Sequence, residues 1–429
     1  MEDDPLALPL TLPCGVTLPN RIAKAAMTEG LADPLDQPTE RHERLYARWA
    51  EGGVGLSITG NVMVDRRFLE RAGNVVLDQT SELAAFRAWA AAGTRGGTQL
   101  FAQLNHPGRQ CTRASSREPL APSAVGLDLM GLFGRPRALE EHEIRTIIRA
   151  WANAARLCRE AGFSGVQIHA AHGYLASQFL SPIVNLRTDD WGGPLDKRAR
   201  FLLELVRAVR QAVGPGFPVA VKLNSSDFQK GGFTAVESAT VAHWLAEEGI
   251  DLLEISGGTY EALAFMGDGM QSYEGRSRST ETREAFFLDY ARTVRAAAPA
   301  LPMMVTGGFR SSGFMRQALR DGELDVVGLG RPFCVMPDLA GRLLARTVDT
   351  LPAPERALRL GPGALGPSSE STQVRGLNSQ AEAAYFYAQL IELAEGRGPR
   401  HGLGPARALM EHARGELQRA RARRFRSGR

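Results

Sequence analysis

Two histidines and a tyrosine lie close together in the segment VQIHAAHGYL, residues 166–175. His169 and His172 are three residues apart, and Tyr174 follows two residues later. Two imidazoles at this spacing could bind a metal ion, hold a carbonyl oxygen or an oxyanion by hydrogen bonds, or be hydrogen-bonded core residues. A tyrosine beside them could donate a proton. The elements that position these side chains decide among the three interpretations.

The histidine segment follows one of eight short apolar segments that alternate with segments of helical periodicity. Between Ile144 and Cys158, for example, apolar residues recur every three to four positions, and Gly162 ends the pattern. This places Cys158 in a core rather than in a reactive site. The expected strands are 21–27, 54–60, 98–104, 165–169, 218–223, 251–255, 302–306 and 325–329. The expected helices are 39–51, 81–95, 140–161, 195–213, 234–248, 284–297, 311–320 and 337–346.

Strands too apolar to have a wet face, each followed by a helix, predict a parallel sheet covered by helices. Because there are eight units, we expect an α/β fold of the closed (β/α)8 TIM barrel type over residues 1–349. The segment LPLTLPCGVTLPN would form an N-terminal hairpin at the barrel bottom, and residues 105–139 a lid. Residues 350–370 would be a linker. Residues 371–429 would form a helical C-terminal extension with a basic tail, packed on the barrel or on a second copy in a homodimer.

The composition limits the class of protein. With 44% hydrophobic and 23% charged residues, the chain has the make-up of a globular protein with a sizeable core. No segment has the length and apolarity of a membrane span, and the acidic start lacks the basic flank of a signal peptide, so we expect a cytoplasmic protein without a membrane partner. The four cysteines have no CxxC spacing, which disfavours zinc and iron–sulfur sites.

The basic charge is concentrated at the C-terminus. Residues 414–429 contain seven arginines and one glutamate, whereas the net charge of the whole chain is only +4. The rest of the chain is therefore close to neutral. We expect this tail to be a solvated terminus and not a nucleic-acid site, because no aromatic or groove-reading motif accompanies it.

The active site of such a barrel lies at the carboxyl ends of its strands, and polar or small residues follow all eight. Gly307 and Gly308 follow the seventh strand, and Gly330 and Arg331 the eighth. Glycine lets backbone N–H groups approach an anion, and arginine adds a permanent charge, so a phosphate-bearing ligand is favoured here. The other candidates are Ala25, Ala26, Met27 and Thr28 after the first strand, Asn61 after the second, Gln103, Asn105 and His106 at the third, Lys222 at the fifth and Ser256 after the sixth.

A cofactor across the barrel mouth would account for these residues together. A lysine such as Lys222 is costly to bury without an anionic partner. A reduced isoalloxazine, which carries negative charge near N1 and O2, would be such a partner, and Gln103 could bind the edge of the ring.

This setting weighs against metal binding by His169 and His172. A metal would need a third or fourth ligand, and we expect no Asp or Glu in register at the strand ends. Two core histidines remain an alternative. A pair of hydrogen-bond donors that grips one oxyanion or carbonyl, with Tyr174 as the acid beside it, fits better.

Over residues 5–346 the chain resembles the Old Yellow Enzyme family of FMN-dependent NADH:flavin oxidoreductases and ene-reductases. The resemblance rests on LPNRIAKAAMTE, GLSITGNVMV, FAQLNHPGRQ, FSGVQIHAAHGYLASQFLSPIVNLRTDDWGG, LEISGG, MVTGGF and VVGLGRP, in this order. It implies a (β/α)8 barrel with one FMN and NAD(P)H as electron donor. Lys222 stands where many relatives have arginine, and Thr28 where one branch has cysteine.

The resemblance also implies roles for single residues. Ala25, Ala26, Met27 and Thr28 would lie along the flavin and Asn61 near its O4 edge. Gln103 and Lys222 would bind its pyrimidine side, and Gly307, Gly308, Gly330 and Arg331 its phosphate. His169 and His172 would hold the substrate oxygen or the nicotinamide amide, and Tyr174 would be the proton donor.

The expected reaction transfers hydride from NAD(P)H, through flavin N5, to the β-carbon of an electron-poor alkene: an enone, enal, nitroalkene or maleimide. Three alternatives stay open. They are an FMN-dependent amine dehydrogenase or demethylase, an NADH oxidase, and a flavin-binding protein without turnover. For this reaction, the sequence predicts a small-molecule substrate as the binding partner.

Overall fold

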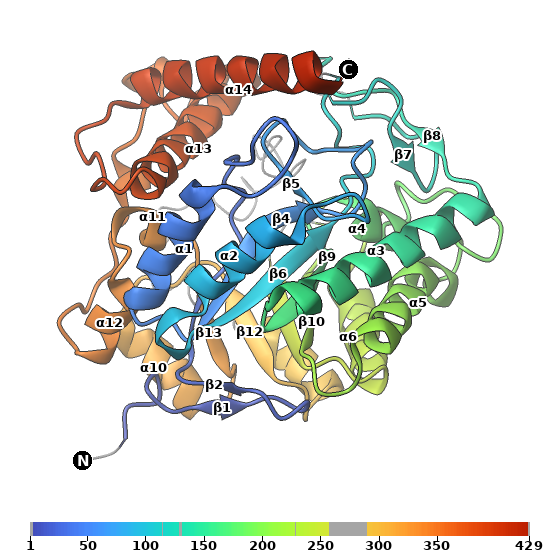
Figure 1. Ribbon diagram of the computed structural model, residues 1–429, viewed down its shortest axis with the longest axis horizontal. Helices are drawn as coiled ribbons and strands as arrows, with labels where there is room; N and C mark the ends of the chain where they lie inside the picture. The colour runs from blue at the N-terminus through green and yellow to red at the C-terminus, as the bar shows by residue number, and fades with distance from the viewer. Residues whose placement is uncertain (1–2, 114, 128–130, 228, 257–289, 428–429) are drawn as a thin grey trace.

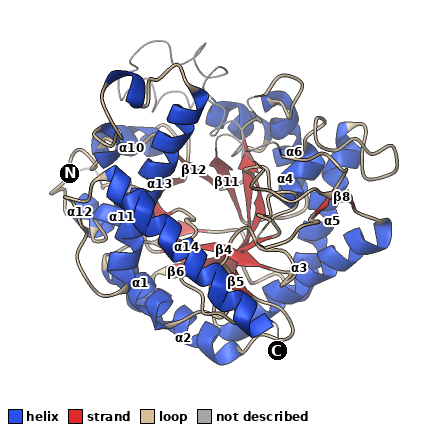
Figure 2. Ribbon diagram, turned by 90° about the horizontal axis from the view of Figure 1, so that it is seen from above, coloured by secondary structure: helices blue, strands red, loops and turns tan. Residues whose placement is uncertain are grey.

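The computed structural model describes residues 3–113, 115–127, 131–227, 229–256 and 290–427. Eight parallel strands close into a barrel, since the first strand of the ring pairs with both the second and the last. Each expected strand overlaps one of these, so the predicted (β/α)8 barrel is confirmed (Figures 1 and 2). The strands are β3 (Ile22–Lys24), β4 (Leu56–Met63), β6 (Gln99–Asn105), β9 (Gly165–Ala170), β10 (Val219–Asn224), β11 (Leu252–Ser256), β12 (Met303–Thr306) and β13 (Val326–Leu329), with β5 (Val75–Val76) added to β4 outside the ring.

Helices cover the outside of the barrel. They are α1 (Glu40–Glu51), α2 (Leu83–Gly93), α3 (Glu141–Ala161), α5 (Leu195–Val213), α6 (Ala235–Glu247), α10 (Ser312–Arg320) and α12 (Leu339–Leu344). A 3-10 turn, η1 (Arg95–Gly97), precedes β6, and the short helices α4 (Leu175–Leu180) and α11 (Pro332–Val335) follow the fourth and eighth strands. Part of the expected helix 284–297 lies outside the described residues. In α3, Glu140 and Glu143 form a capping box at the start of the helix. Gly162 ends the helix, as the sequence predicts, and does so in the left-handed conformation.

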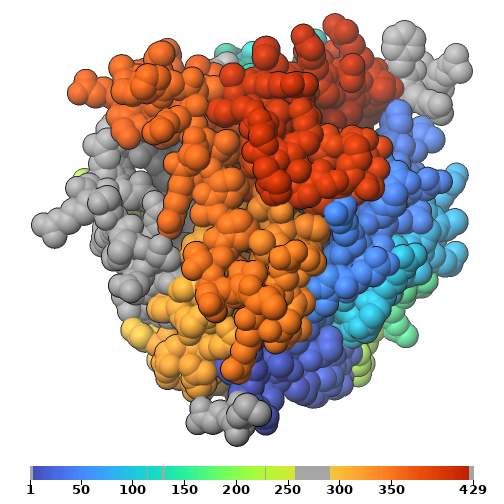
Figure 3. All heavy atoms as spheres, turned by 90° about the vertical axis from the view of Figure 1, so that its left-hand side faces the viewer, coloured from blue at the N-terminus to red at the C-terminus, as the bar shows by residue number. Residues whose placement is uncertain are grey.

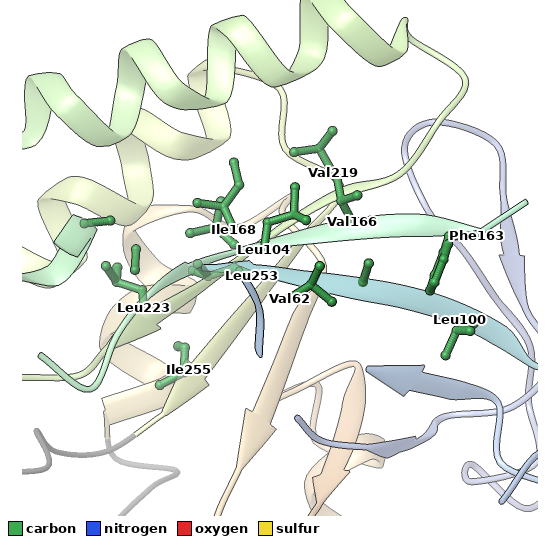
Figure 4. Packing of buried hydrophobic residues seen from close by; sticks show 14 of the residues in the cluster. Val62, Leu100, Leu104, Phe163, Val166, Ile168, Val219, Leu223, Leu253 and Ile255 are labelled. Carbon is green, nitrogen blue, oxygen red and sulfur yellow. The ribbon is translucent and has the colours of Figure 1, made fainter. Parts of the chain in front are cut away.

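The barrel interior has an apolar bottom, because alternate side chains of each strand point inward. Its members are Ala23, Leu56, Ile58, Phe101, Ala220, Leu252, Met304 and Val326. Leu12 and Leu18 pack against them from the hairpin of β1 (Leu10–Thr11) and β2 (Thr17–Leu18), which confirms the expected hairpin. The outward residues of neighbouring strands, such as Val62, Leu104 and Ile168, pack in a second, larger core beneath the helices (Figure 4).

The long third loop is held by its own short elements. Within it, β7 (Leu120–Ala121) pairs with β8 (Arg137–Ala138), and Thr112 forms an isolated antiparallel bridge with Phe133. The buried guanidinium of Arg109 donates to the carbonyl oxygen of Val125 at 3.2 Å. Two separate stretches of the loop are thereby tied together.

After the barrel, the chain passes through two short turns, η2 (Pro354–Arg356) and η3 (Gly363–Leu365), to α13 (Thr372–Ala394) and α14 (Pro405–Ser427). Helix α13 packs on α1 and α11, and α14 packs on α13. Figure 1 shows α14 at the end of the barrel opposite the hairpin, and in Figure 2 it crosses in front of the strands. Figure 3 shows this C-terminal region against the N-terminal part of the chain. The extension therefore covers part of the barrel mouth.

The expectation of a solvated basic tail is wrong for its inner part. Arg423 donates to Asp36 at 2.9 Å, and the Asp36 side chain is only 4% exposed. Arg71 of the loop after β4 likewise binds Glu416 of α14 at 2.5 Å. Buried or half-buried carboxylates bind these arginines, so the tail docks on the barrel loops. Within the described residues, no helix combines the length and the apolarity that a bilayer crossing requires.

Candidate active site

His169, His172 and Tyr174 meet at the carboxyl end of β9. The His169 ring centroid lies 5.1 Å from that of His172 and 4.9 Å from that of Tyr174, and both ring pairs are edge-to-face. His169 and Tyr174 are each 2% exposed. Gln167 points into the barrel, since its side chain hydrogen-bonds across the interior. Alternate residues of a strand point to the same side, so His169, two residues later, also points inward, at the barrel mouth. The three residues that the sequence singled out therefore form one cluster.

The backbone at His172 adopts an unusual conformation that its neighbours hold in place. Its φ of 59° lies in the left-handed region, which non-glycine residues seldom adopt. Its N–H donates to Asn224 Oδ1 at 3.0 Å, and its carbonyl accepts from Gln110 Nε2 at 2.8 Å. Two side chains, Asn224 at the end of β10 and Gln110 in the third loop, thus fix the backbone that carries the imidazole, as strained active-site residues require.

Both imidazoles are neutral. Burial lowers the pKa of His169 and of His172 well below 6.5, and the nearby charge of Lys222 lowers both further. The Nδ1 atom of His169 accepts a hydrogen bond from the N–H of Ala171 at 3.2 Å, so the ring proton lies on Nε2. His172 Nε2 lies 2.8 Å from the Ser256 hydroxyl, which can donate to it and leave the ring proton on Nδ1. Each ring can then offer one N–H to a ligand oxygen.

Beneath the histidines lies a continuous chain of buried polar side chains. Gln103 Nε2 donates to Gln167 Oε1 at 2.7 Å, and Gln167 Nε2 donates to Glu254 Oε2 at 2.7 Å. Glu254 in turn forms an ion pair with Lys222, with Oε1 and Nζ 2.9 Å apart. The expectation that no acidic residue stands near the strand ends is therefore wrong. Lys222 has a protein carboxylate as its anionic partner because β10 and β11 pair with these two residues in register.

A second carboxylate lies at the ends of β3 and β4. Asn61 Nδ2 donates to Glu70 Oε2 at 2.7 Å, and the Thr28 hydroxyl approaches the same oxygen at 3.4 Å. Asn61 Oδ1 is buried and has no hydrogen-bond partner among the described residues. Glu70 thus fixes the orientation of the Asn61 amide, and the Oδ1 atom of this amide remains as a hydrogen-bond acceptor without a partner among the described residues. Such an orphaned acceptor fits a ligand that supplies a hydrogen-bond donor.

The other residues of the first strand end line the adjoining wall. Ala25 is 1% exposed and belongs to the inner core, with Ala26 packed against it. Met27 Sδ lies 3.5 Å from Cys334 Sγ, and a Cβ added to Gly330 would come no closer than 3.7 Å to it. This end of the barrel therefore presents small or flexible apolar groups.

At the expected phosphate site, the backbone has the glycine conformations that an anion site needs. Its arginine, however, already binds a carboxylate of the protein. Gly307 and Gly308 have φ values of 128° and 77°, which favour glycine, and Gly330 begins the turn into α11. Arg331, however, forms an ion pair with Glu382 of α13. The C-terminal extension thus reaches the residue that we expect to bind phosphate.

Sequence reasoning missed Gln167, Glu254 and Glu70. The first two could have been found from the two-residue period of a strand, because Gln167 precedes His169 by two residues and Glu254 follows the inward-facing Leu252 by two. Glu70 lies in a loop and has no such signal.

Asn105 and His106 are adjacent in the sequence, but their side chains lie in different surroundings. The buried Asn105 amide has no partner among the described residues, whereas the His106 ring packs near Trp151 of α3.

Comparisons with known proteins agree with this geometry. The family model described as NADH:flavin oxidoreductase / NADH oxidase family matches residues 5–349. The NADH-dependent flavin oxidoreductase iliE of Hypocrea jecorina (strain QM6a) is 40% identical over 364 residues, which cover 80% of this chain and 88% of that protein. The NADH oxidase of Thermoanaerobacter brockii is 32% identical over 74% of this chain, but the match spans only 48% of that protein.

Two solved structures have a similar fold at low sequence identity. The old yellow enzyme homologue from Zymomonas mobilis superposes with a TM-score of 0.67 at 26% identity, over 83% of this chain and 97% of the other. Morphinone reductase superposes with a TM-score of 0.66 at 26% identity, over 82% of this chain and 92% of the other.

Proposed function

Because the chain belongs to the NADH:flavin oxidoreductase / NADH oxidase family, the Old Yellow Enzyme family, and is an NAD(P)H-dependent FMN oxidoreductase, we propose that it is an ene-reductase. Its acceptors would be electron-poor alkenes: enones, enals, nitroalkenes and maleimides. The observation that carries the proposal is the cluster of two neutral imidazoles and Tyr174 at the barrel mouth.

The residues at the mouth fit a bound FMN. The orphaned Asn61 Oδ1 supports a role as acceptor from the ring system. Ala25, Ala26, Met27 and Thr28 would flank the ring, and Gln103 and Lys222 would bind its polar edge. Gly307, Gly308, Gly330 and Arg331 would bind its phosphate. When bound, FMN supplies the two-electron chemistry that connects NAD(P)H to the acceptor.

His169 and His172 would bind the activating oxygen of the acceptor. Two fixed N–H donors from neutral rings stabilise the charge that develops on a carbonyl or nitro oxygen without themselves losing a proton. The Gln110 and Asn224 contacts to the His172 backbone hold one donor in place before the acceptor arrives. Tyr174 would then deliver a proton to the carbon next to the activated group.

The test separates the two half-reactions in the FMN-loaded protein. Under anaerobic conditions NADPH or NADH should bleach the flavin absorbance, and cyclohexenone should restore it with formation of cyclohexanone. If cyclohexenone, a nitroalkene and a maleimide all fail to restore the absorbance that oxygen restores, the protein is an NADH oxidase of narrower function and the proposal is wrong.

A further inference from the structure

Strand β4 contains one extra residue opposite β6, directly before Asn61. Ile58 of β4 pairs with Phe101 of β6. Asn61 pairs with Gln103, so three steps along β4 match only two along β6. Such a bulge leaves one residue of the strand without a regular partner and redirects the side chains that follow it. We call residues 59–60 the β4 bulge.

The β4 bulge decides which way the Asn61 side chain points. Phe101 and its partner on β4 both belong to the inner core, and Gln103 also points inward. In a regular ladder Gly60 would lie opposite Gln103, and Asn61 would point outward, because alternate residues face opposite sides. The extra residue instead turns Asn61 toward the barrel interior. Val62, the next residue, accordingly packs in the outer core (Figure 4).

Two side chains bind the N–H of Gly60, which is part of the bulge. This N–H donates to Glu29 Oε1 at 2.9 Å and to the Tyr46 hydroxyl oxygen at 3.1 Å. The hydroxyl in turn donates to the same Oε1 atom. Burial raises the pKa of Tyr46 well above 10, and Glu29 raises it further, so this phenol keeps its proton. A Cβ at position 60 would collide with the Glu29 carboxyl and the Met27 carbonyl, so this approach requires glycine.

The groups that hold the bulge are themselves buried and fixed. Glu29 is 6% exposed, and Tyr46 of α1 is fully buried. Lys24, at the end of β3, donates from Nζ to the Tyr46 hydroxyl at 3.4 Å. Its ammonium also lies 4.5 Å from the ring centroid of Trp49. Residues of β3, α1 and the segment after β3 thus meet at the bulge, which lets a carboxyl group fix the backbone of another strand.

We propose that Glu29, supported by Tyr46, is a positioning residue that holds the β4 bulge and thereby directs Asn61 toward the flavin. This inference rests on the proposed function, in which Asn61 Oδ1 accepts a hydrogen bond from the ring system. The amide nitrogen of Asn61 is bound to Glu70, so the oxygen is the atom left for the ring. Asn61 is expected at the O4 edge, beside N5. Reduced flavin has an N–H at N5 that oxidised flavin lacks, so an acceptor there favours the reduced form.

The experiment measures the midpoint potential of the FMN-loaded full chain. Glu29→Gln removes a charge but keeps an amide oxygen for Gly60, whereas Glu29→Ala removes both. We expect the potential of Glu29→Ala to lie below that of Glu29→Gln by about 30 mV, which for a two-electron couple is a tenfold weaker preference for reduced flavin. Asn61→Ala should lower the potential of the wild type by a similar amount.

Double variants test whether Glu29 acts through Asn61. In the Asn61→Ala background, Glu29→Ala and Glu29→Gln should have the same potential. Asp251→Ala is the matched control. The Asp251 side chain is 3% exposed and accepts from Val219 N at 2.8 Å, at the amino end of β10. This control should lose stability in urea denaturation and leave the potential unchanged.

Tyr46→Phe provides the same test if Glu29→Ala does not fold. It keeps the ring beside Lys24, whose Nζ lies 4.8 Å from the ring centroid, and removes only the hydroxyl that supports Glu29. It leaves the charge of the site unchanged. Tyr46→Phe should lower the potential of the wild type and have no effect on that of Asn61→Ala.

The proposal is overturned if Glu29→Ala and Glu29→Gln have equal potentials, or if their difference persists in the Asn61→Ala background. It is also overturned if Asn61→Ala leaves the potential unchanged, since the bulge would then not direct this side chain to the flavin. Failure of cyclohexenone to reoxidise the flavin would instead contradict only the proposed ene-reductase reaction, because the potential is measured without an acceptor.

Discussion

Lys222 and Glu254 form a buried ion pair inside the barrel, with Nζ and Oε1 2.9 Å apart and side-chain exposures of 4% and 0%. The pair ends the hydrogen-bonded chain that begins at Gln103. Glu254→Gln would leave the lysine charge uncompensated, so we expect the free energy of unfolding to fall by about 3–5 kcal/mol. Chemical denaturation of the FMN-free protein measures this.

A second variant separates charge from packing. Lys222→Met/Glu254→Gln removes both charges and keeps an amide oxygen that can accept from Gln167, so it should recover most of the stability that Glu254→Gln alone loses. In the FMN-loaded protein, Glu254→Gln should also raise the flavin midpoint potential, because an unpaired lysine favours the anionic reduced form. A loss of stability below about 1 kcal/mol in Glu254→Gln would contradict the buried ion pair.

Tyr174→Phe removes one hydroxyl and keeps the ring that packs on His169. If Tyr174 is the acid, we expect cyclohexenone reduction to slow by about 10²–10⁴-fold. Flavin reduction by NADPH should continue at its normal rate because that step needs no such acid. Stopped-flow measurement of both half-reactions checks this, and equal slowing of both would assign the residue to folding or flavin binding.

Ser256→Ala tests whether the serine sets the protonation of His172. Its hydroxyl lies 2.8 Å from Nε2, and without it the ring proton is free to move between the two nitrogens. We expect the KM for cyclohexenone to rise by roughly tenfold, the equivalent of one hydrogen bond, with flavin content unchanged. Ser256→Thr retains a hydroxyl and should recover most of the affinity. Nitrogen NMR of labelled histidine gives an independent reading of the tautomer.

Stability should fall as the pH falls below 6.5, because buried histidines must be protonated when the chain unfolds. Burial lowers the pKa of His42 to about 3 and that of His106 to about 4. A depressed histidine pKa means that the folded state binds fewer protons than the unfolded state. The contribution of each such histidine to the free energy of unfolding is complete above pH 6.5, and it decreases as the pH falls toward the pKa of the histidine in the folded state.

His42→Gln isolates one of these groups. Glutamine at this third helical position can keep the capping contact that the His42 ring now makes with the N–H of Thr39. The variant should lose about 2 kcal/mol less stability than the wild type between pH 7 and pH 5. Urea denaturation across this range is the measurement. The exposed His142→Gln is the control, and an unchanged slope in His42→Gln would disprove the assignment.

The C-terminal extension should contribute to the stability of the barrel mouth through Arg71. This guanidinium lies 4.3 Å from the ring centroid of Tyr387 and 2.5 Å from Glu416. We expect Arg71→Leu to lower the free energy of unfolding by about 3 kcal/mol, because Glu416 loses a partly buried partner. Arg95→Ala breaks a pair with Glu51 in which both side chains are exposed, by 57% and 60%, and should cost less than about 1 kcal/mol. Similar losses in both variants would show that α14 does not depend on Arg71.

The sequence alone determined the barrel and the neighbourhood of the site. Apolar segments with a two-residue period and helices with a three-to-four-residue period are local properties, so the eight strands and most helices were found near their true bounds. Because parallel strands of a barrel end on one face, the same reasoning gathered His169, His172 and Tyr174 at the mouth.

Only the tertiary structure decided which groups meet across the barrel. Glu254 is the partner of Lys222 because β10 and β11 pair in one register, and Ser256 reaches His172 from 84 positions along the chain. Arg423 binds Asp36 although 387 positions separate them. A sequence period records which side of an element is buried. It does not record which distant partner packs there, since that depends on how the whole chain closes.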